Sequence, residues 1–305
     1  MHWFAIAIIA PFLYAVTNHI DKVLLEKYFK TRGVHALLLI STLLSGLAIP
    51  VFFVQSPEAL HLPISTVVIM CLVGCMNFIV LWLYLLALRD DEASVVIVFY
   101  QLVPVFGVIL GYFLLGEVLS NLELIAMATV IFGTSIISFE IDSDNNFKVK
   151  IKTVFLMVSA SFFWALGSVV LKMVSLQEGV SASLFWEHIT LLSIGFVLII
   201  VSKKFRQSFI SIFKMNTKPV LLLNFGNEVL YMIGNWVFAF SYLLAPIALI
   251  LIMNSFQPIF VFLIGIILTF IAPTLGTEKV SLFNISQKLI AIGITGVGTY
   301  LLLYS

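Results

Sequence analysis

The sequence predicts an all-α membrane protein with ten transmembrane helices. Of its 305 residues, 62% are hydrophobic and only 10% are charged, whereas soluble domains are close to half apolar and a quarter charged. Apolar runs of about 19 to 25 residues, long enough to cross a bilayer, recur along the chain. The ten expected spans are 3–21, 35–54, 65–88, 94–115, 121–139, 153–174, 182–202, 219–242, 247–271 and 283–303. The connections between them are too short to hold a soluble domain.

Composition and motifs exclude several function classes. The net charge of +1 provides no basic face for a nucleic acid. No Gly-rich phosphate loop, HExxH-like metal spacing or Ser/His/Asp set is present, so we expect no enzyme, no cofactor and no metal. Cys71 and Cys75 lie one helical turn apart in an apolar run, but two thiols alone do not make a zinc site. The expected partners are a small-molecule substrate and the lipid bilayer, with the chain as a monomer or homodimer.

Basic residues are distributed unequally between the two membrane faces. Side B denotes the face that holds connections 1–2, 3–4, 5–6, 7–8 and 9–10. Fifteen of the sixteen Lys and Arg residues lie there, and Lys172 is the exception. The positive-inside rule therefore predicts that side B is cytoplasmic and that both termini are external. The side B segment "KKFRQSFISIFKMNTK" carries Phe205, Phe209 and Phe213 four residues apart, so it lies on an anionic leaflet or forms a solvated connection.

The two halves of the chain form an internal repeat. "APFLYAVTNHIDK" (10–22) aligns with "ASFFWALGSVVLK" (160–172). Further pairs keep the same order in both halves: Trp82 with Trp236, Pro104 with Pro258, Gly111 with Gly265, Glu117 with Glu278 and Gly133 with Gly293. The predicted repeats are residues 1–147 and 148–305. Each holds five spans, an odd number, so the repeats enter the membrane from opposite sides, a 5+5 inverted repeat of the kind found in transporters.

These segments resemble the drug/metabolite transporter superfamily, EamA type. The residues that carry the resemblance are the aromatic-led, Lys-ended first helix of each half and the closing segments "ASVVIVFYQLVPVFGVILGYFLLGEVLSNLELIAMATVIFGTSII" and "IALILIMNSFQPIFVFLIGIILTF…GTEKVSLFNISQKLIAIGITGVGTYLL". The resemblance implies a cavity lined by helices 1, 3, 4, 6, 8 and 9. It also implies a bacterial inner-membrane location and cytoplasmic termini, opposite to the charge count. Members export amino acids and other metabolites, or carry nucleotide-linked sugars.

Polar residues form stripes in two of the predicted spans. The stripe in 219–242 comprises Asn224, Asn227, Glu228, Tyr231 and Asn235, which share one helical face. The stripe in 3–21 comprises Tyr14, Thr17, Asn18 and Asp21. A charge at the bilayer centre costs at least about 2.5 to 3.5 kcal/mol. Both stripes are therefore expected to face protein or a water-filled cavity.

Further candidates lie on other spans. Pro104 and Pro258 are expected hinges, because each proline frees a backbone carbonyl one turn earlier. The remaining cavity candidates are Asn77, Trp82, Tyr84, Tyr100, Gln101, Trp164, Ser168, Trp236, Asn254 and Gln257. Four of them are expected to supply walls for an apolar or aromatic group: Trp82, Tyr84, Trp164 and Trp236.

Glu228 is the sharpest candidate, because it lies near the middle of its span. It would couple proton movement to transport or bind a substrate amine; alternatively, neighbouring amides satisfy it and it only fixes helix packing. Asp21, Glu187 and His188 are the other candidates for proton coupling. The alternatives are an interfacial anchor for Asp21 and a local hydrogen-bonded pair for Glu187 and His188. Lys172 could likewise be a snorkelling anchor.

The sequence thus predicts a secondary transporter of small polar or amphipathic metabolites, amino acids or related compounds, working by alternating access as an exporter. Proton coupling is part of this hypothesis. One alternative is a flippase or transporter of a lipid-linked or nucleotide-linked sugar, for which Lys22 and Lys172 are the available basic residues. An alternative of another class is a non-transporting membrane scaffold.

Overall fold

The computed structural model describes residues 2–24, 33–90, 96, 99–138, 151–214, 218–271 and 282–304, which are helical apart from short turns. Within these ranges six helices are long and apolar enough to cross a membrane: His2–Val23, Val34–Gln55, Ile64–Arg89, Ile151–Glu178, Val180–Val201 and Ile247–Leu268. Three shorter apolar helices are Phe99–Leu115, Asn121–Ile136 and Leu289–Leu303. With α12 (Lys218–Ser241), whose polar stripe lowers its hydropathy, they account for the ten predicted spans.

The structure subdivides four of these spans. Span 1 comprises α1 (His2–Ala7) and α2 (Ile9–Val23); span 2 comprises α3 (Gly33–Leu44), η2 (Ser45–Ala48) and α4 (Ile49–Gln55); span 4 comprises η4 (Phe99–Gln101), α7 (Leu102–Leu110) and η5 (Gly111–Leu115); span 9 comprises α13 (Ile247–Leu251), η6 (Ile252–Phe256) and α14 (Gln257–Ile271). The other spans are α5 (Ile64–Asp90), α8 (Asn121–Ser138), α9 (Ile151–Glu178), α10 (Val180–Val201), α12 and α15 (Leu282–Leu303).

Prolines explain where the spans break. Pro11, Pro50, Pro104 and Pro258 each lie within three residues of a break in spans 1, 2, 4 and 9. Proline has no N–H to donate and its ring clashes with the carbonyl four residues earlier, so a regular α-helix cannot pass through it unchanged. Spans 4 and 9, which the repeat pairs, both carry a 3₁₀ segment just before the proline, and the hinge role of these prolines stays a prediction.

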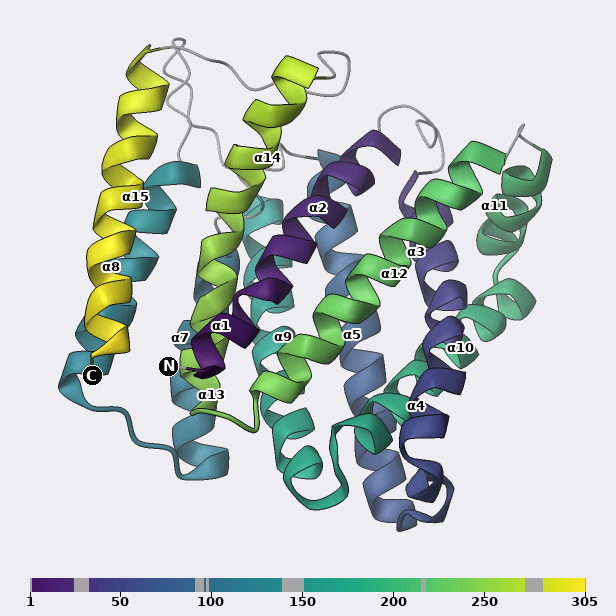
Figure 1. Ribbon diagram of the computed structural model, residues 1–305. Coiled ribbons are helices and arrows are strands. Elements are labelled where there is room, and N and C mark those ends of the chain that lie inside the picture. Colours follow the sequence, from purple (N-terminus) through teal and green to yellow (C-terminus); the bar gives the residue numbers. More distant parts are fainter. Residues whose placement is uncertain are drawn as a thin grey trace.

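Helix packing follows the inverted repeat. α5 packs on α9 as α12 packs on α2, and α7 packs on α9 as α14 packs on α2. α5, α7 and α9 are spans 3, 4 and 6, and their counterparts five spans away are α12, α14 and α2 of spans 8, 9 and 1. In each pair, the second contact is therefore the repeat equivalent of the first. α8 and α15, the fifth spans of the two halves, lie side by side at one edge of the bundle (Figure 1).

The α8–α15 contact depends on glycine. A Cβ placed on Gly133 would lie 2.6 Å from Thr295 Oγ1, and one placed on Gly298 would lie 2.8 Å from the Val130 backbone nitrogen. These approaches are closer than any real Cβ contact, so the two helices come together through their backbones. Small residues at such contacts are how membrane helices pack without a hydrophobic driving force.

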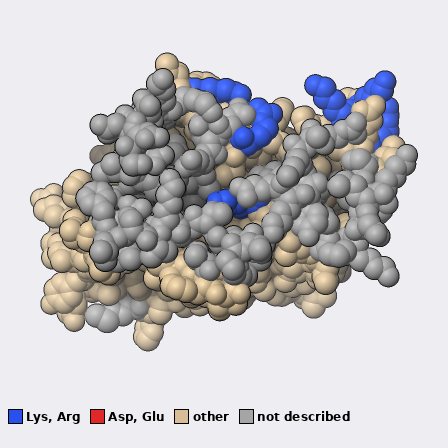
Figure 2. Space-filling view, turned by 90° about the horizontal axis from the view of Figure 1, so that it is seen from above, with Lys and Arg blue, Asp and Glu red and all other residues tan. Residues whose placement is uncertain are grey.

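Both chain ends lie at one face of the bundle, where α1 begins and α15 ends (Figure 1). The opposite face is side B. Lys and Arg side chains gather on it, and no Asp or Glu is visible there among the described residues (Figure 2). The side B helix ends carry the described basic residues Lys22, Arg89, Lys152, Lys203, Lys204 and Arg206.

The basic segment after span 7 folds as a helix, α11 (Lys203–Lys214). The Phe205 side chain is 7% exposed, and its ring centroid lies 5.0 Å from that of His35 on α3. Phe209 also packs against the core. The bundle therefore covers these two rings. They are not available for the contact with an anionic leaflet that the sequence suggested. The Phe213 side chain lies outside the described part.

Candidate functional site

One cavity lies between the two halves and has about 1000 Å³ of empty space, including the part open to solvent. Its lining runs from the middle of the bundle towards side B, because it includes Asp21 near the end of α2, Leu37 near the start of α3 and Leu85 near the end of α5. The predicted candidates that line it are Tyr14, Thr17, Asn18, Asp21, Asn77, Tyr84, Tyr100, Trp164, Asn227, Glu228, Tyr231 and Gln257.

Aromatic rings form the central part of this cavity. Tyr14 and Trp164, which the repeat pairs, meet edge to face with ring centroids 6.4 Å apart. Tyr231 lies 5.6 Å from Tyr14, and Tyr100 lies 4.9 Å from Trp164. Tyr84 stacks on Tyr100 at 5.9 Å. Such faces bind apolar, aromatic or cationic groups.

The wall towards side B is acidic. Asp21 and Glu228 both line it, although each is largely buried by neighbouring helices. Asn227 Nδ2 donates a hydrogen bond to Asp21 Oδ1 at 2.7 Å, which joins the polar stripes of α2 and α12. The side chain of Ser41 on α3 lies next to the Glu228 carboxyl. The lining contains no Lys, Arg or His in the part of the chain that is described.

Glu187 lies behind the cavity wall rather than in it. This α10 residue is 1% exposed. Asn77 Nδ2 donates to its Oε1 at 2.8 Å, and Asn235 Nδ2 approaches the same oxygen at 3.4 Å. His188 does not pair with it: His188 Nδ1 lies 2.9 Å from the Leu184 carbonyl oxygen, and its ring packs against Phe52. The local Glu187–His188 pair considered from the sequence is therefore wrong.

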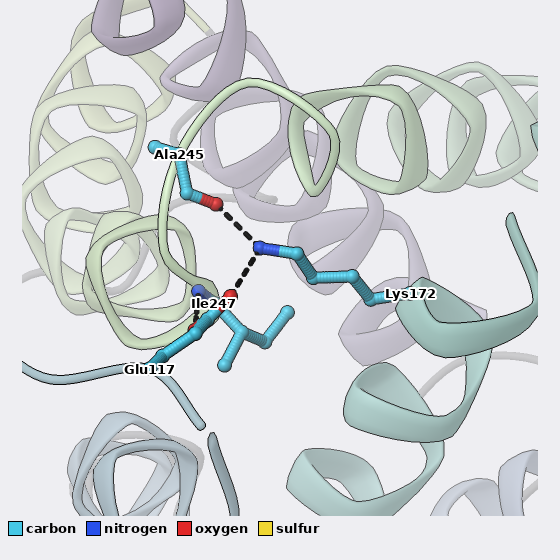
Figure 3. Close-up of polar contacts among 4 residues, drawn as sticks. All are labelled: Glu117, Lys172, Ala245 and Ile247. Atoms are coloured by element: carbon cyan, nitrogen blue, oxygen red, sulfur yellow. Dashed lines mark hydrogen bonds and ion pairs between the residues drawn. The ribbon is translucent and has the colours of Figure 1, made fainter. Parts of the chain in front are cut away.

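A second polar cluster lies towards the face of the termini, and Figure 3 shows its four residues, Glu117, Lys172, Ala245 and Ile247. Lys172 Nζ lies 2.5 Å from Glu117 Oε1 and donates to the Ala245 carbonyl oxygen at 2.7 Å. The Ile247 N–H donates to Glu117 Oε2 at 2.6 Å. The cluster connects spans 4, 6 and 9. The Lys172 side chain is only 8% exposed, so this residue is a buried ion-pair partner and not a snorkelling anchor.

The sequence around Glu117 explains how its carboxyl reaches this cluster. Gly116 adopts a φ of 67° and ends span 4. This left-handed conformation is readily available to glycine. Glu117 N–H then donates to the Gly111 carbonyl oxygen at 3.1 Å, which folds the chain back against α13. Downstream, the Ser120 and Glu123 side chains cap each other's backbone N–H groups and start α8, a capping box.

The paired helix breaks carry buried polar groups without partners. Both amide atoms of Gln101 in η4 and both of Asn254 in η6 have no hydrogen-bond partner, and neither do Ser255 Oγ and Gln257 Oε1. The two 3₁₀ segments contact each other. An unsatisfied buried polar group costs about 1 to 3 kcal/mol. These atoms are therefore available to water or a ligand.

The remaining predicted candidates lie outside the cavity lining. Trp82 and Trp236 occupy equivalent outer positions, 41% and 38% exposed. Ser168 accepts a hydrogen bond from Tyr242 OH at 2.9 Å. Asn224 and Asn235 belong to the polar stripe of α12, but only Asn227, Glu228 and Tyr231 of that stripe reach the cavity. Glu278, the repeat mate of Glu117, falls outside the described residues.

Sequence reasoning missed the contribution of spans 2 and 7. Ser41, Thr42 and Ser45 of span 2 line the cavity, and so does Leu191 of span 7. The resemblance implied a lining from spans 1, 3, 4, 6, 8 and 9 only. The three hydroxyl residues, spaced at i, i+1 and i+4 in an apolar run, were the available signal.

The long apolar helices of the described part are those of an integral membrane protein. Residues 1–139 match the model of the EamA-like transporter family. This match covers 139 of the 305 residues and makes the first half of the chain similar to EamA-like transporters, which belong to the drug/metabolite transporter superfamily.

Comparisons with other proteins add the fold alone. No curated protein matches the sequence at a significant level. Among solved structures, 27 chains match. One of them, titled only "Crystal structure of protein", is 13% identical with a TM-score of 0.65, over 98% of this chain and 94% of that one.

Proposed function

We propose that the protein is a secondary transporter that exports small amine-bearing metabolites, amino acids and related compounds, by alternating access. The observation that carries this is the composition of the cavity wall. Two carboxyl groups, those of Asp21 and Glu228, line the cavity together with aromatic rings, and no described basic side chain balances them. A buried carboxylate needs a cationic partner, so the site suits an ammonium group or a proton.

The arrangement of the two halves supports the proposal of alternating access. The cavity reaches towards side B, while the Lys172–Glu117 cluster holds spans 4, 6 and 9 together on the opposite side. Paired hinges at Pro104 and Pro258 supply the places at which spans 4 and 9 can bend. We assign side B to the cytoplasm of a bacterial inner membrane on its basic residues, so the cavity faces the compartment from which an exporter loads.

The alternative of a lipid-linked or nucleotide-linked sugar has less support. Those substrates carry phosphates, and their recognition requires basic or other cationic groups in the cavity. Lys172 is held by Glu117 and the Ala245 carbonyl group, and neither it nor Lys22 lines the cavity. The acidic wall would repel a phosphate.

Counterflow in proteoliposomes tests the substrate class. Vesicles loaded with an amino acid should take up the same labelled compound against its gradient, and a panel of amino acids should give at least one such substrate. A matched panel of N-acetylated amino acids, which lack the ammonium group, should fail. Uptake of the acetylated forms at equal rates would exclude the acidic wall as the recognition element.

Cysteine labelling tests whether the α12 stripe lines a water-filled cavity open to side B. In inside-out membrane vesicles, a membrane-impermeant thiol reagent should modify Asn227→Cys and Tyr231→Cys, measured as a mass shift, in a protein whose own Cys71 and Cys75 are replaced by serine. Ile233→Cys is the matched control, because Ile233 is 47% exposed on the same helix but does not line the cavity, so lipid should protect it. Equal protection of all three positions would favour the scaffold alternative.

A further inference from the structure

Glu187 is a buried carboxyl group outside the cavity lining. Its two polar contacts come from different helices: Asn77 of α5 and Asn235 of α12 both approach Oε1, and Glu187 itself belongs to α10. Its second oxygen, Oε2, is buried and has no hydrogen-bond partner. A lone buried carboxylate with one open oxygen is a costly arrangement that packing alone does not require.

The surroundings of Glu187 contain no countercharge among the described residues. The titratable groups that interact with it electrostatically are the phenols of Tyr14, Tyr231 and Tyr242. His188, next to it on α10, turns its Nδ1 to the Leu184 carbonyl oxygen. The neighbouring helices α5 and α12 present amides at this point. The carboxyl group must therefore be compensated by something that enters the protein.

The coordination suits a proton and not a metal ion. Metal ions such as Ca²⁺ or Mg²⁺ take about six to eight oxygen or water ligands, whereas Glu187 offers one open oxygen. In the described ranges, no group of three or more His, Cys, Asp or Glu side chains is placed so that it could hold a metal ion.

Asn77 connects this carboxyl group to the cavity. Its Nδ2 points to Glu187, while the residue itself lines the cavity. Its Oδ1 lies 3.7 Å from where a Cβ on Gly167 of α9 would be, so the amide spans the gap between α10 and α9. A Cβ on Gly74, one turn earlier on α5, would lie 2.9 Å from the Glu187 carbonyl oxygen. Such close packing allows a change at Glu187 to reach α5 directly.

We propose that Glu187 is a second proton site of the transporter and that the Asn77 amide couples its protonation to the substrate cavity. This deepens the proposed function, because proton coupling presupposes transport. Ionised Glu187 accepts charge-assisted hydrogen bonds from Asn77 and Asn235, and these are roughly twice as strong as neutral ones. They hold α5 and α12 against α10. A proton bound at Oε2 weakens both bonds but keeps them, so that a ligand in the cavity can then take the Asn77 amide away from Glu187 and the two helices can separate.

Infrared difference spectroscopy of the purified protein tests the proton site without any substrate. On acidification, the C=O stretching band of a protonated carboxyl group should appear and should be missing in Glu187→Gln. Glu228→Gln should remove a different band. Asn77→Ala should shift the Glu187 band, because it removes the 2.8 Å hydrogen bond to Glu187 Oε1. Asn235→Ala should shift the band less, because it removes only the 3.4 Å contact with the same oxygen.

Two results would overturn the inference. One is a Glu187→Gln spectrum identical to that of the wild type. The other, decisive even if that variant does not fold, is an unshifted band in Asn77→Ala and Asn235→Ala. Failure of the counterflow assay would reject the proposed transport function but leave these spectra unchanged, so the two failures are distinguishable.

Discussion

Replacing Lys172 by methionine is expected to lower the free energy of unfolding by about 3 kcal/mol, because removing one partner of a buried ion pair leaves the other charge uncompensated. Lys172 is the only described cation next to Glu117, and its loss also deprives the Ala245 carbonyl group of its donor. Methionine keeps much of the volume and apolar stem of lysine. Thermal unfolding of the detergent-solubilised protein, followed by the fluorescence of its five Trp residues, measures the change.

The double variant Lys172→Met/Glu117→Gln separates charge from packing. Glutamine keeps an oxygen that can accept from the Ile247 N–H, now bonded to Glu117 Oε2 at 2.6 Å, but carries no charge. Most of the lost stability should therefore return in the double variant. If the double variant is as unstable as Lys172→Met alone, the cluster acts through packing and not through its charges.

The single variant Lys172→Met should also open the cavity towards the side of the termini. Without Lys172, span 6 loses its contacts with Glu117 and with the Ala245 carbonyl group just before α13. A thiol reagent applied from the side of the termini should then reach Tyr14→Cys faster than in the parent protein, because Tyr14 lies at the central end of the cavity. Unchanged reactivity would show that other contacts close this side.

The sequence allowed prediction of spans, repeat and stripes because each depends on local spacing. The stripe of α12 is visible from helical periodicity alone, and so is its counterpart on α2. What periodicity does not show is depth of burial across the helix face. Asn227 and Glu228 reach the cavity, whereas Asn235, two turns further along the same stripe, contacts Glu187 instead.

The sequence could not place the hydroxyl residues of span 2 or the Lys172–Glu117 ion pair, and the reasons differ. Thr42 and Ser45 donate to backbone carbonyl groups three residues earlier, so the same sequence is compatible with a lipid-facing or a cavity-facing helix. Lys172 could not be separated from a snorkelling anchor, because its partner Glu117 is 55 residues away in the chain. Its other partner is a backbone carbonyl group, which has no sequence signature.

Glu228→Gln is expected to abolish proton-driven accumulation while leaving exchange intact. In a proton-coupled exporter, substrate and proton move in opposite directions, so proteoliposomes with an acid lumen should accumulate substrate as protons leave. A gradient of one pH unit stores about 1.4 kcal/mol per proton, enough for about tenfold accumulation. Glutamine cannot carry the proton, so accumulation should fall to the level without a gradient. Counterflow, which needs no proton, should persist because glutamine preserves the size and polarity of the site.

Glu58→Gln is the matched control, because Glu58 is an exposed carboxyl group in the connection between spans 2 and 3 and does not line the cavity. It should retain the full response to the gradient. Loss of counterflow as well as accumulation in Glu228→Gln would mean that Glu228 binds the substrate amine itself. An unchanged pH response in that variant would remove Glu228 from the coupling mechanism and leave Glu187 and Asp21 as the carboxyl groups that can carry it.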